Sequence, residues 1–82
     1  MYPDVVVVGS YVQDLTWQCA AFPRPGETVV GTFVPGPGGK GSNQAIAAGR
    51  AGARTGFMGA VGKDGYAAEA RRFYRENAVA CH

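Results

Sequence analysis

Nine residues starting at position 36 combine glycines with side chains that donate hydrogen bonds. They read Gly-Pro-Gly-Gly-Lys-Gly-Ser-Asn-Gln and lead directly into a stretch with helical spacing. Glycines let a ligand approach the backbone N–H groups closely, and the start of a helix leaves several of those groups without partners. Lys40 and Asn43 add side-chain donors beside them. The segment therefore predicts a site for a polar ligand, in preference to a flexible connection followed by an ordinary helix cap.

Two phosphate-binding motifs can be compared with this segment. A Walker A loop needs serine or threonine directly after its lysine and glycine at its first position, where Gly41 and Val34 stand here. The dinucleotide pattern G-x-G-x-x-G does match Gly36, Gly38 and Gly41. That pattern normally follows a buried strand, whereas the residues before this segment alternate as in a half-exposed strand. A dinucleotide-binding unit is therefore the less favoured alternative.

The elements that position the segment follow from the hydrophobic pattern. Residues 5–9, four valines and a glycine, predict a strand buried on both faces of a parallel sheet. Residues 15–19 and part of residues 28–34 alternate apolar and polar side chains, which predicts two strands with one exposed face each. Between them, Arg-Pro-Gly-Glu at residues 24–27 suits a type II turn. We expect a small antiparallel flap over about residues 14–35.

Helix signals follow the glycine-rich segment. Residues 36–41 contain too many glycines for regular structure, and Ser42 is expected to cap a helix that ends near residue 51. Gly52 then provides the left-handed end of that helix. Residues 55–61 predict the next strand.

A second helix is expected over about residues 65–77, with Asp64 as its cap and a new apolar run from Val79. The alternation of strands and helices indicates an α/β fold with a Rossmann-like parallel sheet. Residues 1–82 form one unit in this interpretation. Because so short a unit leaves sheet edges and helix faces uncovered, we expect it to be the amino-terminal part of a larger domain, truncated at its carboxyl end.

Composition excludes several classes of protein. Hydrophobic residues make up 46% of the 82 residues, with 13 glycines and 17% charged residues, which is typical of a folded α/β interior and not of disorder. A net charge of +2, without a basic cluster, predicts no nucleic-acid partner. Cys19 and Cys81 form no C-x-x-C pair, so no metal site is expected. The longest apolar run is too short to span a membrane, which makes a cytoplasmic location the default expectation.

Four segments of the chain share their order and spacing with a known family. They are Val8-Gly9-Ser10 followed by Asp14, Phe22-Pro23-Arg24-Pro25-Gly26-Glu27-Thr28, GPGGKGSNQAIAAGRAGA from residue 36, and Val61-Gly62-Lys63-Asp64-Gly65. Together they resemble ribokinase and the PfkB-type carbohydrate kinases over nearly the whole chain. The Gly-Gly-Lys-Gly-Ser-Asn-Gln block is similar to that family's first signature.

The resemblance implies a ribokinase-like fold in which the flap is a lid over a sugar. It implies that Asp14 accepts hydrogen bonds from sugar hydroxyls. It further implies that the backbone at Gly38 and Gly39, with the side chains of Lys40 and Asn43, holds the same sugar. The activity implied for the full-length enzyme is ATP-dependent phosphorylation of a sugar hydroxyl.

The resemblance also implies groups that this chain lacks. Full-length relatives bind ATP and magnesium, with a monovalent cation, through a carboxyl-terminal half, and their catalytic aspartate starts a Gly-Ala-Gly-Asp helix. No such segment is present in the 82 residues, so we expect no catalytic, cofactor-binding or metal-binding residue here and no activity from the chain alone. In the family, lids of this kind often pair across a homodimer. A non-catalytic binding or regulatory fragment that uses the same loop is the alternative from a different class.

Two positions depart from the family pattern, and the roles of two aromatic residues remain open. Val12 stands where ribokinase-like sequences usually have an asparagine, two residues before the aspartate, which makes ribose a doubtful substrate. Lys63 stands where an acid is common, so Asp64 is interpreted as a helix cap and not as a ligand. Tyr11 and Trp17 either line the sugar pocket or pack as ordinary core.

Overall fold

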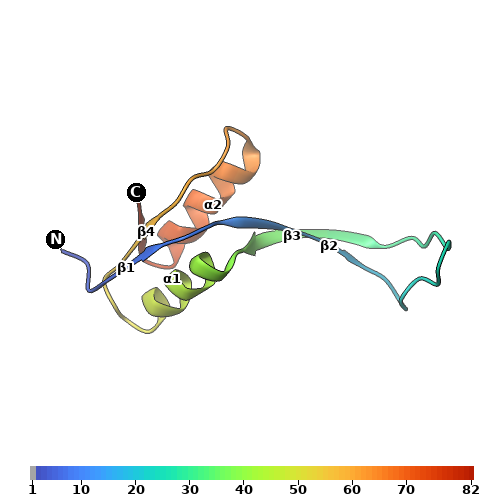
Figure 1. Ribbon diagram of the computed structural model, residues 1–82, viewed down its shortest axis with the longest axis horizontal. Coiled ribbons are helices and arrows are strands. Elements are labelled where there is room, and N and C mark those ends of the chain that lie inside the picture. The colour runs from blue at the N-terminus through green and yellow to red at the C-terminus, as the bar shows by residue number, and fades with distance from the viewer. Residues whose placement is uncertain (1) are drawn as a thin grey trace.

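The computed structural model describes residues 2–82 and has an α/β body with a long β-hairpin arm (Figure 1). In chain order the elements are β1 (Val5–Val8), β2 (Val12–Gln18), β3 (Thr32–Gly38), α1 (Lys40–Arg50), β4 (Thr55–Met58), α2 (Gly65–Glu76) and β5 (Val79–Cys81). Strands β1, β4 and β5 form a parallel sheet in the order β1-β4-β5. Strands β2 and β3 form a separate antiparallel pair. The predicted α/β class and the predicted flap are both confirmed.

Both helices pack on one face of the parallel sheet. Right-handed crossovers that step in one direction along a sheet place their helices on the same face, and the chain takes two such steps here. The resulting core contains Ala45 and Ile46 of α1, Phe57 of β4, Ala70 and Tyr74 of α2, and Val79 of β5. This core holds the amino-terminal end of α1 beside the sheet.

The opposite face of the sheet has no helix over it in the part of the chain that the structure describes. Val6, Val8 and Met58 on that face are 51%, 77% and 46% exposed. The prediction that residues 5–9 are buried on both faces is therefore wrong for this chain. β1 is an edge strand, and one of its faces meets no described element.

The antiparallel pair is an arm that projects from the body. Its register runs from Val12 opposite Gly38 to Gln18 opposite Thr32. The Cα radius of gyration is 15.7 Å, against about 12 Å for a compact domain of this length. Figure 1 shows the reason, since β2 and β3 extend together far beyond the helices. The flap thus stands clear of the core and is joined to it only at its base.

The turn at residues 24–27 has the predicted geometry. The Glu27 N–H donates to the Arg24 carbonyl at 3.0 Å, and Gly26 has a φ of 76°, as the third position of a type II turn requires. The predicted left-handed glycine after α1 is confirmed as well, since Gly52 has a φ of 98°. Asp64 caps α2 as expected, because its carboxylate accepts a hydrogen bond from the Ala67 N–H at 2.9 Å.

Two predictions around the glycine-rich segment are wrong. Residues 36–38 belong to β3, because pairing with β2 supplies hydrogen bonds that a glycine-rich stretch could not make alone. Helix α1 begins at Lys40 after Gly39, without a side-chain cap, so Ser42 is not the cap. Ser42 lies inside the first turn instead, with 1% of its surface exposed. The strand predicted over residues 55–61 also ends earlier, at Met58.

We predict that the 82-residue chain expressed alone is at best marginally stable, because one face of its sheet exposes valine and methionine side chains to water. The expected result is a broad thermal transition at low temperature and binding of a hydrophobic dye before unfolding. Circular dichroism and dye fluorescence measure both. A sharp cooperative transition with well-dispersed amide resonances in a dilute monomer would contradict this.

Candidate functional site

Glycines bring the start of α1 into backbone contact with the chain leaving β1. A Cβ atom added to Gly41 would lie 3.1 Å from the Gly9 Cα, and one added to Gly9 would lie 3.2 Å from the Gly41 Cα. At Gly39, whose φ is 101°, an added Cβ would lie 2.5 Å from the Ser10 carbonyl oxygen. Side chains at these positions would push the helix away from the strand. The helix amino terminus is thereby held at the carboxyl end of β1.

The Asp14 carboxylate lies directly against Gly38. A Cβ atom added to Gly38 would come within 2.6 Å of the Asp14 Cγ and of both its carboxylate oxygens, so the carboxylate occupies the space that a side chain at position 38 would take. Asp14 reaches this place from β2, where it pairs with Gly36 of β3. The two strands of the flap therefore bring an acidic group to the end of the glycine-rich segment.

The first turn of α1 presents hydrogen-bond donors. Asn43 makes the first intrahelical bond, from its N–H to the Gly39 carbonyl at 2.8 Å. The N–H groups of Lys40, Gly41 and Ser42 precede this bond and have no acceptor within the helix. Lys40 and Asn43 are one turn apart and exposed, whereas Ser42 between them is buried. The turn thus offers backbone and side-chain donors together.

The structure brings some predicted site residues into contact and leaves others apart. Asp14 contacts Gly38, and Gly39 contacts the residues that lead into β2. Within residues 2–82 the side chains of Asp14, Lys40 and Asn43 make no hydrogen bond or ion pair. All three side chains are exposed. Their convergence on one shared cavity remains a prediction.

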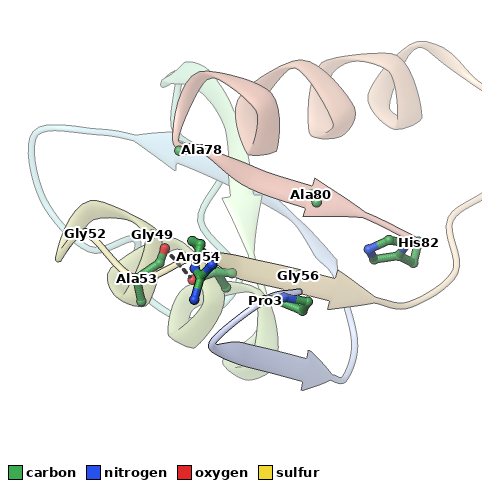
Figure 2. A pocket seen from close by; sticks show the side chains of 10 residues that line it. Pro3, Gly49, Gly52, Ala53, Arg54, Gly56, Ala78, Ala80 and His82 are labelled. Carbon is green, nitrogen blue, oxygen red and sulfur yellow. Dashed lines mark hydrogen bonds between the residues drawn. The ribbon is translucent and has the colours of Figure 1, made fainter. Parts of the chain in front are cut away.

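One cavity of about 420 Å³ extends from the amino-terminal ends of β4 and β5 along these strands to His82, which follows β5 (Figure 2). Glycine and alanine residues form much of its lining, together with Pro3, Arg54 and His82. The Arg54 guanidinium pairs with the Asp4 carboxylate at 2.7 Å and lowers the pKa of that carboxyl. None of the predicted site residues lines this cavity. The Arg54–Asp4 ion pair joins the residue before β1 to the residue before β4. No residue that lines this cavity belongs to the glycine-rich segment.

Two sets of side-chain hydrogen bonds, which the sequence pattern did not predict, lie beside the candidate site. The buried Tyr74 hydroxyl donates to the Ser42 Oγ at 2.7 Å. The Tyr11 hydroxyl donates to the Gln13 Oε1 at 2.8 Å, and the Gln13 Nε2 donates to the Gly36 carbonyl at 3.0 Å. Burial raises the pKa of Tyr74 and of Tyr11, so both hydroxyls remain protonated donors at neutral pH. No spacing pattern in the sequence indicates these pairs.

The two aromatic residues left open by the sequence have different surroundings. Tyr11 packs against the core with its ring edge toward Tyr74, at 6.1 Å between centroids. Trp17 lies on the flap, 61% exposed and 4.7 Å from the Phe33 ring. Tyr11 is therefore part of the packing beneath the site, and Trp17 stacks within the arm.

The described residues contain neither a metal-binding cluster of His, Cys, Asp or Glu side chains nor a helix that could span a membrane. No group of three or more His, Cys, Asp or Glu side chains in residues 2–82 is placed to hold a metal ion. Neither α1 nor α2 has the length and apolar character needed to cross a membrane, and these are the helices that the described chain contains.

Comparison with known proteins shows the family of the chain. Residues 3–82 match the model of the pfkB family carbohydrate kinases. The chain is 48% identical over 64 residues to the ribokinase of Bacillus subtilis (strain 168), covering 77% of this chain and 22% of that protein. The chain therefore belongs to the pfkB family of carbohydrate kinases, and it spans about a quarter or less of the length of this curated relative.

Solved structures show the same fold. The ribokinase of Giardia lamblia superposes with a TM-score of 0.84 at 43% identity, over 98% of this chain and 25% of that one. A ribokinase of Arabidopsis thaliana complexed with ribose and ATP superposes with a TM-score of 0.77 at 29% identity, over 99% of this chain and 28% of that one. The fold is therefore ribokinase-like. The dinucleotide-binding alternative loses its structural basis, because Gly36 and Gly38 lie within β3 of an antiparallel pair instead of following a parallel strand.

We predict that Gly39→Ala destabilises the full-length protein by about 2 kcal/mol or more, because the φ of 101° is strained for any side chain and the Ser10 carbonyl stands in the way. The matched control is Gly36→Ala, since nothing lies within 4 Å of a Cβ at that position and its φ is not positive. The control should change stability by less than about 1 kcal/mol. Denaturant unfolding measures both variants, and equal losses would contradict the close-approach argument.

Proposed function

We propose that this chain is the amino-terminal, sugar-binding part of a longer kinase that transfers phosphate from ATP to a sugar hydroxyl. The observation that carries the proposal is the contact between the Asp14 carboxylate and Gly38, at the point where the glycine-rich segment enters α1. An acceptor thus lies beside a cluster of donors. Membership of a carbohydrate kinase family supports the same conclusion.

A sugar suits this combination of groups. Each sugar hydroxyl both donates and accepts hydrogen bonds, so it can donate to Asp14 while accepting from Lys40, Asn43 or the backbone at Gly39. A polar site that loses a matching hydroxyl is left with unpaired groups, which is a strong source of discrimination between sugars. The β2–β3 arm then serves as a lid that closes over the bound sugar and excludes water.

The remaining chemistry belongs to other parts of the polypeptide. ATP, magnesium and a monovalent cation are proposed to bind outside these residues, and they would supply the phosphoryl group and neutralise its charge. Phosphoryl transfer depends mainly on positioning and on charge stabilisation. What residues 2–82 contribute is the orientation of the accepting hydroxyl. The chain alone is therefore proposed to be inactive, and the parent enzyme to work in the cytoplasm.

The arm also supports a proposed homodimer of the parent enzyme through its lids. Leu15, Trp17 and Phe33 share one face of the two strands and are 51%, 61% and 42% exposed. Apolar side chains of this number on a projecting two-stranded sheet are typical of a surface that pairs with a partner. A second lid of the same kind is the partner proposed here.

We predict that Asp14→Ala in the full-length enzyme lowers kcat/KM for its sugar by roughly 10- to 100-fold, because charged acceptors of hydroxyl hydrogen bonds are lost. KM for ATP should stay unchanged. Coupled-assay kinetics measure both constants. Glu69→Gln is the matched control, since Glu69 is an exposed acid on α2 outside the proposed site.

The 82-residue chain serves as the negative control in the same assay. Turnover of any sugar by the chain alone would contradict the placement of the ATP-binding groups elsewhere. Unchanged sugar kinetics in the Asp14→Ala enzyme would overturn the sugar-binding role of this carboxylate.

We further predict that Val12→Asn raises kcat/KM for ribose about fivefold in the full-length enzyme. Val12 pairs with Gly38 and lies two residues before Asp14, so both side chains project from the same face of β2. An amide there adds a hydrogen bond to a ribose hydroxyl that valine cannot make. Steady-state kinetics on ribose test this, with Val30→Asn as the matched control, since Val30 is 96% exposed and lies outside both strands of the flap. A ribose specificity constant that does not change would refute it.

A further inference from the structure

Ser42 has an unusual position for a serine in the first turn of a helix. It does not cap α1, and the cap position, Gly39, has no side-chain hydrogen bond. Ser42 is instead the most deeply buried polar residue of the described core, with 1% of its surface exposed. Lys40 precedes it and Asn43 follows it, so any shift of Ser42 moves both proposed sugar donors.

The partner that holds Ser42 comes from a distant part of the chain. Tyr74 of α2 is 3% exposed, stacks on Phe57 at 5.0 Å between ring centroids, and donates its hydroxyl hydrogen to the Ser42 Oγ at 2.7 Å. Phe57 lies at the centre of the sheet. The ring of Tyr74 is therefore fixed by the core, and its hydroxyl transmits that position to the first turn of α1.

The same ring also contacts the second segment of the site. Tyr11 packs edge-on against Tyr74 and is followed by Val12 and Asp14 in β2. Its hydroxyl donates to Gln13, and the Gln13 amide donates to the Gly36 carbonyl of β3. Tyr74 thus touches the base of the flap on one side and the start of α1 on the other.

We propose that Tyr74 and Ser42 form a positioning pair that sets the first turn of α1 relative to Asp14 and so determines sugar affinity. The proposal rests on the sugar-binding function proposed above. The glycine contacts between Gly41 and Gly9 leave no side chain there to hold the helix in register with the strand. Within residues 2–82 the Tyr74–Ser42 bond is the side-chain hydrogen bond that joins the first turn of α1 to another element, and it adds to the packing of Ala45 and Ile46 in the core.

A role in packing alone makes a different prediction from a positioning role. Phenylalanine at position 74 would keep the stacking on Phe57 and the contact with Tyr11, and would remove only the hydroxyl. Alanine at position 42 would remove the acceptor and leave the aromatic core intact. If the pair merely fills space, either change affects stability and leaves sugar affinity alone.

The experiment measures sugar binding to the full-length enzyme by calorimetry and by steady-state kinetics, for Tyr74→Phe, Ser42→Ala and the double variant. Each single variant should raise the sugar Kd and the sugar KM about fivefold. KM for ATP should not change. The double variant should bind no more weakly than the single variants, because both lose the same hydrogen bond.

Tyr66→Phe is the matched control, since Tyr66 also lies on α2, is 39% exposed, and its hydroxyl has no hydrogen-bond partner in residues 2–82. An unchanged sugar Kd in both single variants, or losses that add in the double variant, would overturn the positioning pair. If Tyr74→Phe folds poorly, Ser42→Ala alone decides, because it leaves the ring in place. If the wild-type enzyme binds no sugar, the proposed function itself is wrong. That result differs from an unchanged sugar Kd in the variants, which overturns only the positioning pair.

Discussion

The close approach of two backbone segments controls the geometry of this molecule. Where the chain leaves β1, Gly9 lies against Gly41 at the start of α1, and Gly39 lies against the Ser10 carbonyl. Only glycine permits such contacts, because a Cβ atom on either side would separate strand from helix. The amino terminus of α1, with its free N–H groups, is consequently held at the carboxyl end of the first strand. Strand β2 of the flap begins beside this contact, and strand β3 ends beside it.

The flap depends on this anchoring for the placement of its carboxylate. Because β2 begins and β3 ends at the glycine contact, the antiparallel register places Asp14 opposite Gly36 and beside Gly38. A shift of the register by one residue would turn Asp14 to the other face of the flap. The outer part of the arm is free of such constraints and projects from the body, as Figure 1 shows. A fixed base and a projecting end are compatible with the lid role proposed above.

The aromatic core connects this site to the rest of the body. Phe57 of β4 and Tyr74 of α2 stack at the centre of the single covered face, and Tyr11 joins them from the base of the flap. Aromatic contacts of this kind contribute stability beyond the burial of area. Because Tyr74 also hydrogen-bonds to Ser42, the same side chain serves the core and the first turn of α1. Stability and the shape of the site are therefore coupled.

The sequence by itself determined the features that depend on neighbouring residues. The valine strand, the type II turn at residues 24–27, the Asp64 cap and the left-handed Gly52 were all predictable, because β-branching, proline, glycine and capping act locally. The glycine-rich segment also indicated a ligand site, and its resemblance to a family signature indicated sugar kinases. Only the tertiary structure decided that β3 continues through Gly36 and Gly38, that Ser42 is buried and not a cap, and that one sheet face stays open. The first two features depend on partners far along the chain, as with Asp14 and Gly36 or Ser42 and Tyr74, and such pairings leave no periodic signal. The open face follows from the strand order, which places both helices on one side.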